Sequence, residues 1–382
     1  MEAVLVVLRS LLVAGALVIV AGTALSALRT FVLPRAAYSL LSRLVFVTIR
    51  TGFDKVVRRL DTYERQDAVM ALFAPVGLLA LPVAWLLIIF TAYGAAYLAI
   101  DPGAGWQAAL DQSGSALFTL GFRPAHGFGA RLLSLTESGL GLTLIALLIT
   151  YLPSIYGAFS RREAAVQKLA VRAGTPPSAV TMLARIHRIG WLDEMDGFFA
   201  SWEDWFVELG ETHTSLAALV FFRSPRSDQS WVTAAGCILD TAAIVSSTVD
   251  LGHRTPNADL CLRAGFLSLR SIGDYLSVPV DHDPSPGDPI SITREEFITA
   301  YEQLAAAGVP VRPDPERCFA DFAGWRVNYD TVLLALASVT MAPLSPWSSD
   351  RSPAFRSPLR RRSLDRPSGR LRRTRKSRNE SR

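Results

Sequence analysis

Three long stretches without a formal charge constrain this chain more than any other feature of its sequence. They lie between Arg9 and Arg29 (19 residues), from Ala68 to Ile100 (33 residues) and from Ser138 to Ser160 (23 residues). About 20 apolar residues suffice for a helix to cross the hydrocarbon core of a bilayer, and helices of soluble proteins seldom stay uncharged for so long. We therefore expect an all-α membrane protein with three transmembrane helices, the first of them within residues 1–30.

The basic residues predict how these helices are oriented. Eight lysines and arginines lie between residues 29 and 66 and four between 161 and 172, whereas the loop 101–131 holds two. Because Lys and Arg accumulate on the cytoplasmic side, we expect the N-terminus outside, the loop 31–67 inside and the C-terminus in the cytoplasm of a multi-pass plasma-membrane protein. A cleaved signal peptide would leave the basic loop outside, and the first apolar run exceeds the 7–15 residues of such peptides.

The basic loop 31–67 contains its own helical pattern. Leucines and other apolar residues between 40 and 46 alternate with Arg43 and Arg50. This pattern is typical of an amphipathic helix that lies on the membrane surface, and equally of a soluble helix packed under the transmembrane bundle. The sequence leaves both interpretations open.

The chain after residue 160 has the spacing of a soluble helical domain. Helical patterns run over 161–173, 178–189, 193–221, 228–249, 257–276 and 319–339, and Thr293 with Glu296 forms a capping box for a helix through Ala307. The segments Trp231–Val249 and Val332–Met341 are apolar, but the first contains Asp240 and the second is short. We therefore expect two buried helices there within an all-α cytoplasmic domain over residues 161–342.

Residues 343–382 are rich in Pro, Ser and Arg, a composition that does not build a core, so we expect a disordered basic tail. From Arg351 onward the chain has 13 basic and 2 acidic residues, which accounts for the net charge of +5 of the whole chain. The rest of the chain is acidic overall, so a nucleic-acid-binding core is not expected. Three sparse cysteines, Cys237, Cys261 and Cys318, exclude a disulfide scaffold.

No pattern in the chain predicts enzymatic chemistry, a cofactor or a metal site. The five histidines are scattered without metal-ligand spacing, and neither a glycine-rich phosphate loop nor a Gly-x-Ser-x-Gly elbow occurs. The polar segment Glu211-Thr212-His213-Thr214 is expected on a helix surface or at a helix cap. We therefore do not expect an enzyme.

The segment between the second and third apolar stretches predicts the function. Residues 106–120 are moderately apolar but too short to cross a bilayer, and they lead into Thr119-Leu120-Gly121-Phe122. Non-helical backbone at membrane depth is tolerated only where it lines water or is buried in protein. We expect a re-entrant pore helix whose following turn presents backbone carbonyls to a cation, with Gly121 permitting the backbone conformation that the turn needs.

This order of span, short helix, Thr-Leu-Gly-Phe and span resembles the pore module of the potassium channel superfamily, of the two-transmembrane, ion-channel-domain type found in bacteria. The resemblance covers about residues 68–163, and the whole chain resembles actinobacterial ion-channel-like membrane proteins. It implies a filter-like ion pathway at Thr119, Leu120, Gly121 and Phe122, conduction of a monovalent cation such as potassium, and a homotetramer in the lipid bilayer. The chain departs from the family pattern at Arg123 and Pro124, where the family filter continues with a second glycine and usually an aspartate.

Four further residues are candidates for pore support or gating. Glu137 lies near the outer end of the third span, where it could act in permeation, accept hydrogen bonds behind the filter or pair with Arg131. Gly139 and Gly141 favour either helix bending or close packing, and Pro153 is expected to kink the inner helix near its cytoplasmic end.

Two hypotheses follow from the sequence. One is a cation-conducting, channel-like protein. The other is a non-conducting membrane-anchored interaction or sensor protein whose pore loop is degenerate.

Overall fold

The computed structural model describes residues 2–31 and 40–351, and these residues form helices joined by turns and loops. No strand occurs among them, and their extended pairing is limited to an isolated antiparallel bridge between Val249 and Val311. The predicted all-α class is confirmed.

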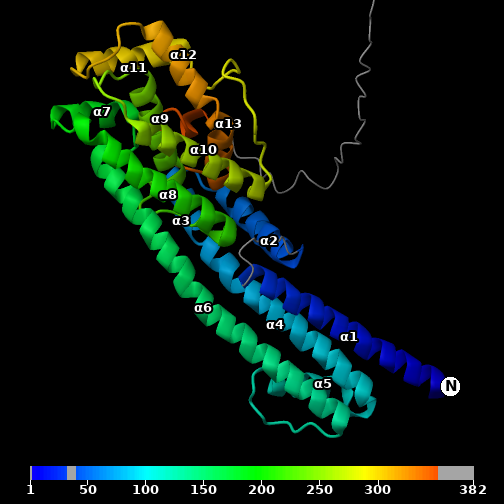
Figure 1. The fold of residues 1–382 in the computed structure, drawn as a ribbon. Helices are drawn as coiled ribbons and strands as arrows, with labels where there is room; N and C mark the ends of the chain where they lie inside the picture. Colours follow the sequence, from blue (N-terminus) through cyan, green and yellow to red (C-terminus); the bar gives the residue numbers. More distant parts are fainter. Residues whose placement is uncertain (1, 32–39, 352–382) are drawn as a thin grey trace, which may run out of the picture.

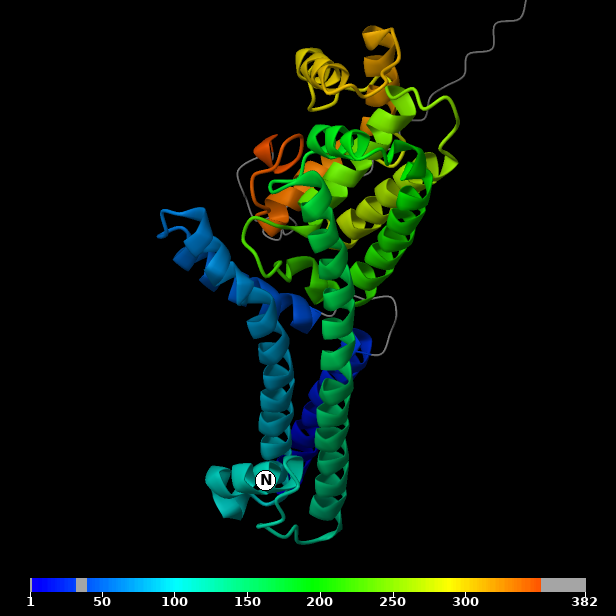
Figure 2. The ribbon, with the colours of Figure 1, turned by 90° about the vertical axis from the view of Figure 1, so that its left-hand side faces the viewer.

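Three helices are long and apolar enough to cross a membrane, as the sequence predicts. They are α1 (Glu2–Phe31), the nearly continuous pair α3 (Tyr63–Ala71) and α4 (Phe73–Ile100), and α6 (Phe128–Ala173). Figures 1 and 2 show α1, α4 and α6 side by side along one half of an elongated molecule. These helices indicate a multi-pass membrane protein.

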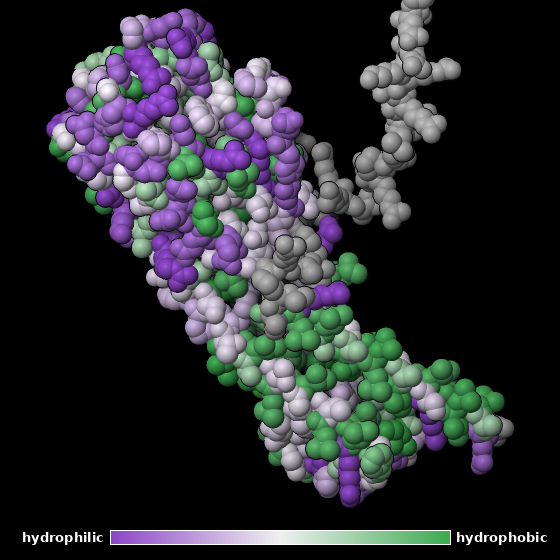
Figure 3. Space-filling view, viewed as in Figure 1, coloured by the Kyte–Doolittle hydropathy of each residue, from purple (hydrophilic) through white to green (hydrophobic). Residues whose placement is uncertain are grey.

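The surface of this half is apolar. Figure 3 shows a wide hydrophobic region around the long helices and a hydrophilic surface over the opposite end of the molecule. Large side chains such as Val18 and Leu135 are more than 70% exposed. Because a water-soluble protein rarely exposes an apolar surface of this extent, lipid is the medium that suits these helices.

The basic loop contains α2 (Leu40–Val57), which packs against the start of α4. Phe46 of α2 lies over Gly77, and the rings of Phe46 and Phe53 both contact Phe73. The helix that the pattern predicts is therefore present, and residues 32–39 lie outside the described part of the chain.

The remaining helices form one large hydrophobic core at the other end of the molecule. They are α7 (Ala179–Arg188), η2 (Leu192–Glu194), α8 (Met195–Ser215), η3 (Ala217–Phe221), α9 (Trp231–Ser247), α10 (Pro256–Leu276), α11 (Arg294–Ala306), α12 (Pro315–Arg326), α13 (Asp330–Thr340) and η4 (Ser349–Arg351). The capping box of Thr293 and Glu296 begins α11, as predicted. The apolar helices α9 and α13 are largely buried in this core, which agrees with the expectation that neither is a span.

Three boundaries differ from the predictions. Helix α6 continues without a break from the third span to Ala173, and the helix expected over 319–339 is two helices separated at Val327–Tyr329. The predicted disorder from residue 343 onward is wrong for residues 343–351. There the Trp347 ring contacts the Phe322 ring, the Trp347 carbonyl accepts a hydrogen bond from Arg326, and Arg351 pairs with Glu296.

Candidate functional site

A short helix lies between α4 and α6 at the end of the apolar half. Helix α5 (Gly105–Leu117) follows the short η1 (Pro102–Ala104) and packs against both long helices. The Ser113 hydroxyl oxygen lies 2.9 Å from the Phe90 carbonyl oxygen, and the Ser138 hydroxyl of α6 donates to the Ala116 carbonyl at 2.8 Å. Phe90 is ten residues before the end of α4, about 15 Å along its axis. The C-terminal end of α5 therefore lies well below the outer ends of its two neighbours.

The turn after α5 holds the four filter-like residues. The amides of Leu120 and Gly121 donate to the Ser115 carbonyl at 2.9 and 3.4 Å, and the Arg123 amide donates to the Ser115 hydroxyl at 3.1 Å. Thr119 and Gly121 have φ angles of 53° and 71°, so the glycine occupies a conformation that a β-carbon disfavours. Ser113 and Ser115 were not among the predicted residues, because only the folded turn brings them to these partners.

The turn after α5 lies on the surface of the single chain. Thr119, Leu120, Gly121 and Phe122 are all exposed. Within the described part of the chain, no hydrogen bond reaches the carbonyl oxygens of Thr119, Leu120 or Gly121. Three neighbouring carbonyls are thus free to meet a ligand or another copy of the chain.

Glu137 of α6 lies behind the turn and is completely buried. Its carboxylate accepts hydrogen bonds from the Ser113 hydroxyl of α5 at 2.5 Å and from the Tyr97 hydroxyl of α4 at 3.0 Å. Arg131 instead donates to the Ala125 carbonyl. Of the roles considered for Glu137, the hydrogen-bonded position behind the turn is the one observed, and it ties three helices together.

The two candidate glycines of α6, Gly139 and Gly141, face different surroundings. A β-carbon on Gly141 would lie 2.2 Å from the Leu117 carbonyl oxygen, whereas a β-carbon on Gly139 would meet nothing within 4 Å. Gly141 therefore permits the close approach of α5 to α6. Gly139 lies on an exposed face of α6 with Thr143, Ala146 and Thr150, a small and hydroxyl-bearing stripe. Pro153 is within α6 and exposed.

Arg123 lies beside the turn and pairs with an acid of α5. Its guanidinium is 3.4 Å from the Asp111 carboxylate, and both side chains are partly exposed. The Asp111 carboxylate therefore offsets part of the positive charge of Arg123 beside the turn.

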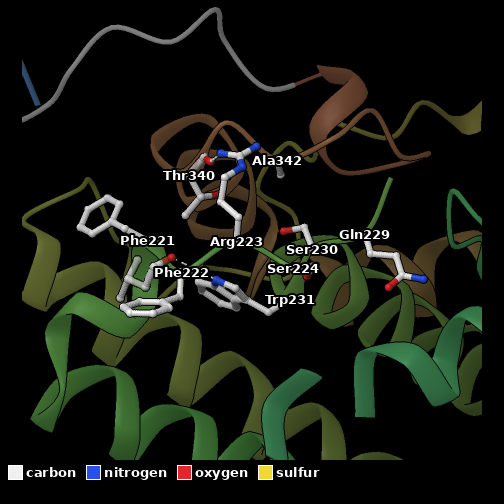
Figure 4. Close-up of a pocket in the computed structure, with 10 residues that line it drawn as sticks. Phe221, Phe222, Arg223, Ser224, Gln229, Ser230, Trp231, Thr340 and Ala342 are labelled. Atoms are coloured by element: carbon white, nitrogen blue, oxygen red, sulfur yellow. Dashed lines mark hydrogen bonds between the residues drawn. The ribbon is translucent and has the colours of Figure 1, made fainter. Parts of the chain in front are cut away.

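A second polar cluster joins the membrane helices to the helical core. Arg223, in the loop after η3, pairs with Asp67 of α3 and donates to the carbonyls of Thr340 and Met341 at the end of α13, each at 2.7 Å. The Tyr63 hydroxyl donates to the same Met341 carbonyl at 3.1 Å. Figure 4 shows Arg223 pointing towards Thr340 from this loop.

A cavity of about 20 Å³ lies beside this cluster, lined by Ser224, Gln229 and Trp231 among others (Figure 4). The Ser224 hydroxyl and the Gln229 carbonyl oxygen are buried and have no partner among the described residues. The cavity has the size and polarity of a site for one water molecule.

The helical core contains a buried network of ion pairs and three buried cysteines. Arg326 is fully buried and pairs with Asp240 at 2.5 Å and Asp330 at 2.7 Å. All three cysteines are free and buried, and burial raises the pKa of the Cys237 thiol. No group of three or more metal-ligating side chains occurs within residues 2–31 and 40–351.

His213 departs from its predicted surface position. It is only 1% exposed, and its Nε2 atom lies 3.2 Å from the guanidinium of Arg162. Arg162, at the far end of α6, also pairs with Glu163 and donates to the Leu219 and Phe222 carbonyls. The sequence carried no signal for this contact, because the two partners are 51 residues apart.

No family model, curated protein or solved structure matches this chain. The membrane class therefore rests on the three long apolar helices, and the resemblance to a channel pore module stays a hypothesis.

Proposed function

We propose that this protein is an ion-channel-like integral membrane protein whose pore is formed by the α5 helix and the turn Thr119–Phe122. In this proposal α4 and α6 are the outer and inner helices of each subunit, and the helical core lies in the cytoplasm beneath a plasma membrane. The permeant ion is a monovalent cation, with potassium as the first candidate.

The observation that carries the proposal is the pair of α5 and its turn. A short helix ends below the outer ends of α4 and α6, and its C-terminus carries the negative end of the helix dipole. Directly after it, the free carbonyls of Thr119, Leu120 and Gly121 offer the oxygen ligands with which channel filters replace a cation's hydration shell. Glu137 supports this geometry from behind through Ser113 and Tyr97.

A pore of this kind needs several copies of the chain. One chain supplies one turn, and the turn faces outward together with the uncharged stripe of Gly139, Thr143 and Thr150. Four copies around an axis would bring the four turns together, so the proposal includes a homotetramer. Mass measurement in nanodiscs should give four chains per particle, and a strict monomer would overturn the channel assignment.

Cation flux from proteoliposomes tests the ion pathway. Gly121→Val should abolish the flux of potassium, because a β-branched residue is strained at a φ of 71° and would distort the turn. Gly127→Val is the matched control, since Gly127 also has a positive φ but lies outside the turn. Equal flux in wild type and Gly121→Val, with both proteins inserted, would place the pathway elsewhere.

Arg123 tests the ion preference. Arg123→Gly should raise cation flux or the preference for potassium over sodium, since a positive charge beside the pathway repels the ion. Asp111→Asn should do the opposite, because it removes the carboxylate that offsets this charge. Unchanged flux in both variants would exclude an electrostatic role for the pair.

The positive charge of Arg123 beside the turn would repel a cation. It therefore favours the second candidate, a non-conducting membrane-anchored interaction or sensor protein. In that case the turn lines no ion pathway and the helical core binds partners. This candidate predicts no cation flux and full tolerance of substitutions at Thr119 and Gly121.

A further inference from the structure

A groove of about 440 Å³ lies between the N-terminal half of α1 and the end of α4. Its wall is formed mainly by apolar side chains, among them Val13, Leu17 and Ile100, and its charged group is Arg9. The residues that line it include no carboxylate. The groove therefore combines an apolar wall with one cationic side chain.

Arg9 has no partner among residues 2–31 and 40–351. Among the described residues, no carboxylate or carbonyl lies within ion-pair or hydrogen-bond distance of its guanidinium, and the side chain is exposed. The neighbouring Ser10 hydroxyl donates to the Val6 carbonyl of its own helix. A guanidinium has five N–H donors in a planar fork that suits phosphate, so the donors of Arg9 are available to a phosphate group.

The position of Arg9 along α1 places it at the membrane surface. Arg9 and Arg29 are 20 residues apart, about 30 Å along a helix, which equals the thickness of the hydrocarbon core. The charge-free stretch of α4 ends at Ile100, directly before Asp101, at the same groove. The position of Arg9 in α1 and that of Ile100 in α4 both place this part of the groove level with the lipid headgroups.

We propose that the groove binds one membrane phospholipid. The phosphate of the lipid accepts hydrogen bonds from the Arg9 guanidinium, and one acyl chain follows α1 from Val13 to Leu17 against the end of α4. This assignment requires only that α1 and α4 span a bilayer, so it holds whether or not the protein conducts ions.

Native mass spectrometry of the full chain in mild detergent tests this site. With added phosphatidylglycerol, wild-type protein should retain one phospholipid per chain. Arg9→Gln should lower the apparent affinity about tenfold or more, as expected for the loss of a charge-assisted hydrogen bond, and Arg9→Lys should restore part of it. Arg29→Gln is the matched control at the other end of the same helix and should leave this lipid bound.

A second variant tests the apolar wall separately. Ala14 lines the groove and is exposed, so Ala14→Phe should fill the space and displace the lipid while the charge of Arg9 remains. Equal lipid retention in wild type, Arg9→Gln and Ala14→Phe would overturn the proposal. Displacement of the lipid by inorganic phosphate alone would also overturn the proposal and indicate a site for a free anion. If wild-type protein retains no lipid and Ala14→Phe forms a smaller oligomer, the groove is instead a contact between copies of the chain.

Discussion

Helices α1 and α9 are both strongly apolar, but their side chains have opposite surroundings. Only five of the 30 residues of α1 are buried, whereas 16 of the 17 residues of α9 are. Helix α9 measures about 25 Å, too short to cross the hydrocarbon core, and it carries Asp240 opposite Arg326. Apolar composition alone does not separate a lipid-facing helix from a core helix. The two kinds of helix are separated by their length and by the presence of a charged residue that forms an ion pair within the protein.

The two halves also treat buried ionisable groups differently. In the helical core, Arg326 lies between the carboxylates of Asp240 and Asp330. In the membrane half, the described partners of Glu137 are the hydroxyls of Ser113 and Tyr97. The core thus neutralises charge with charge, while the site behind the turn surrounds one carboxyl group with neutral donors.

The largest effect is expected where the core balances its charges. Arg326→Ala should destabilise the helical core by about 3–5 kcal/mol, because it leaves two buried carboxylates without their partner. Arg226→Ala removes an exposed ion pair with Asp228 and should leave stability nearly unchanged. Urea unfolding followed by tryptophan fluorescence measures both, and similar costs would contradict the distinction between buried and exposed pairs.

A pair of isoleucine substitutions tests the comparison of α1 with α9 directly. Ile238→Ala should cost about 2–5 kcal/mol, since Ile238 is fully buried in the core. Ile19→Ala should change stability little, because Ile19 of α1 is 53% exposed and faces the medium around the helix. Thermal unfolding in the same detergent compares them, and a large loss in Ile19→Ala would indicate that protein rather than lipid covers α1.

Local patterns predicted much of this fold. Uninterrupted apolar length predicted the three long helices, and the Thr293–Glu296 spacing predicted the start of α11. Both signals lie within a single helix and need no knowledge of its partners.

What the sequence did not predict depends on distant partners. Arg162 is buried beside His213 and donates to two carbonyls of the η3 region, contacts that no local pattern indicates. Residues 343–351 have the composition of a tail, yet the Arg326 guanidinium and Phe322 hold Trp347. In the candidate site, the need for a glycine at position 121 was predictable, whereas the contacts of Glu137 with α4 and α5 were not.

Gly139 and Gly141 of α6 sharpen the comparison within the membrane half. Gly141→Ala should destabilise the packing of α5 on α6 by about 1–3 kcal/mol, because its β-carbon would overlap the Leu117 carbonyl oxygen. Gly139→Ala meets open space and should be neutral or stabilising by up to about 1 kcal/mol. The melting temperature in nanodiscs measures the difference. If Gly139→Ala lowers the melting temperature of the oligomer but not that of the monomer, subunits contact each other at this face.

The smallest effect is a pH dependence of the contact between α6 and the helical core. Burial and the adjacent charge of Arg162 hold the pKa of His213 well below its ordinary value of 6.5, while the Thr212 hydroxyl and the Trp231 ring also contact the imidazole. As the pH falls below 6.5, the unfolded chain binds this proton before the folded chain does. The stability that is present above this pH is therefore lost on acidification, by up to about 1.4 kcal/mol per pH unit. His213→Gln should remove this slope between pH 6.5 and 5, whereas His253→Gln, at an exposed position, should retain it. Urea midpoints at each pH measure the slope, and an identical slope in His213→Gln and wild type would assign the acid sensitivity to other groups.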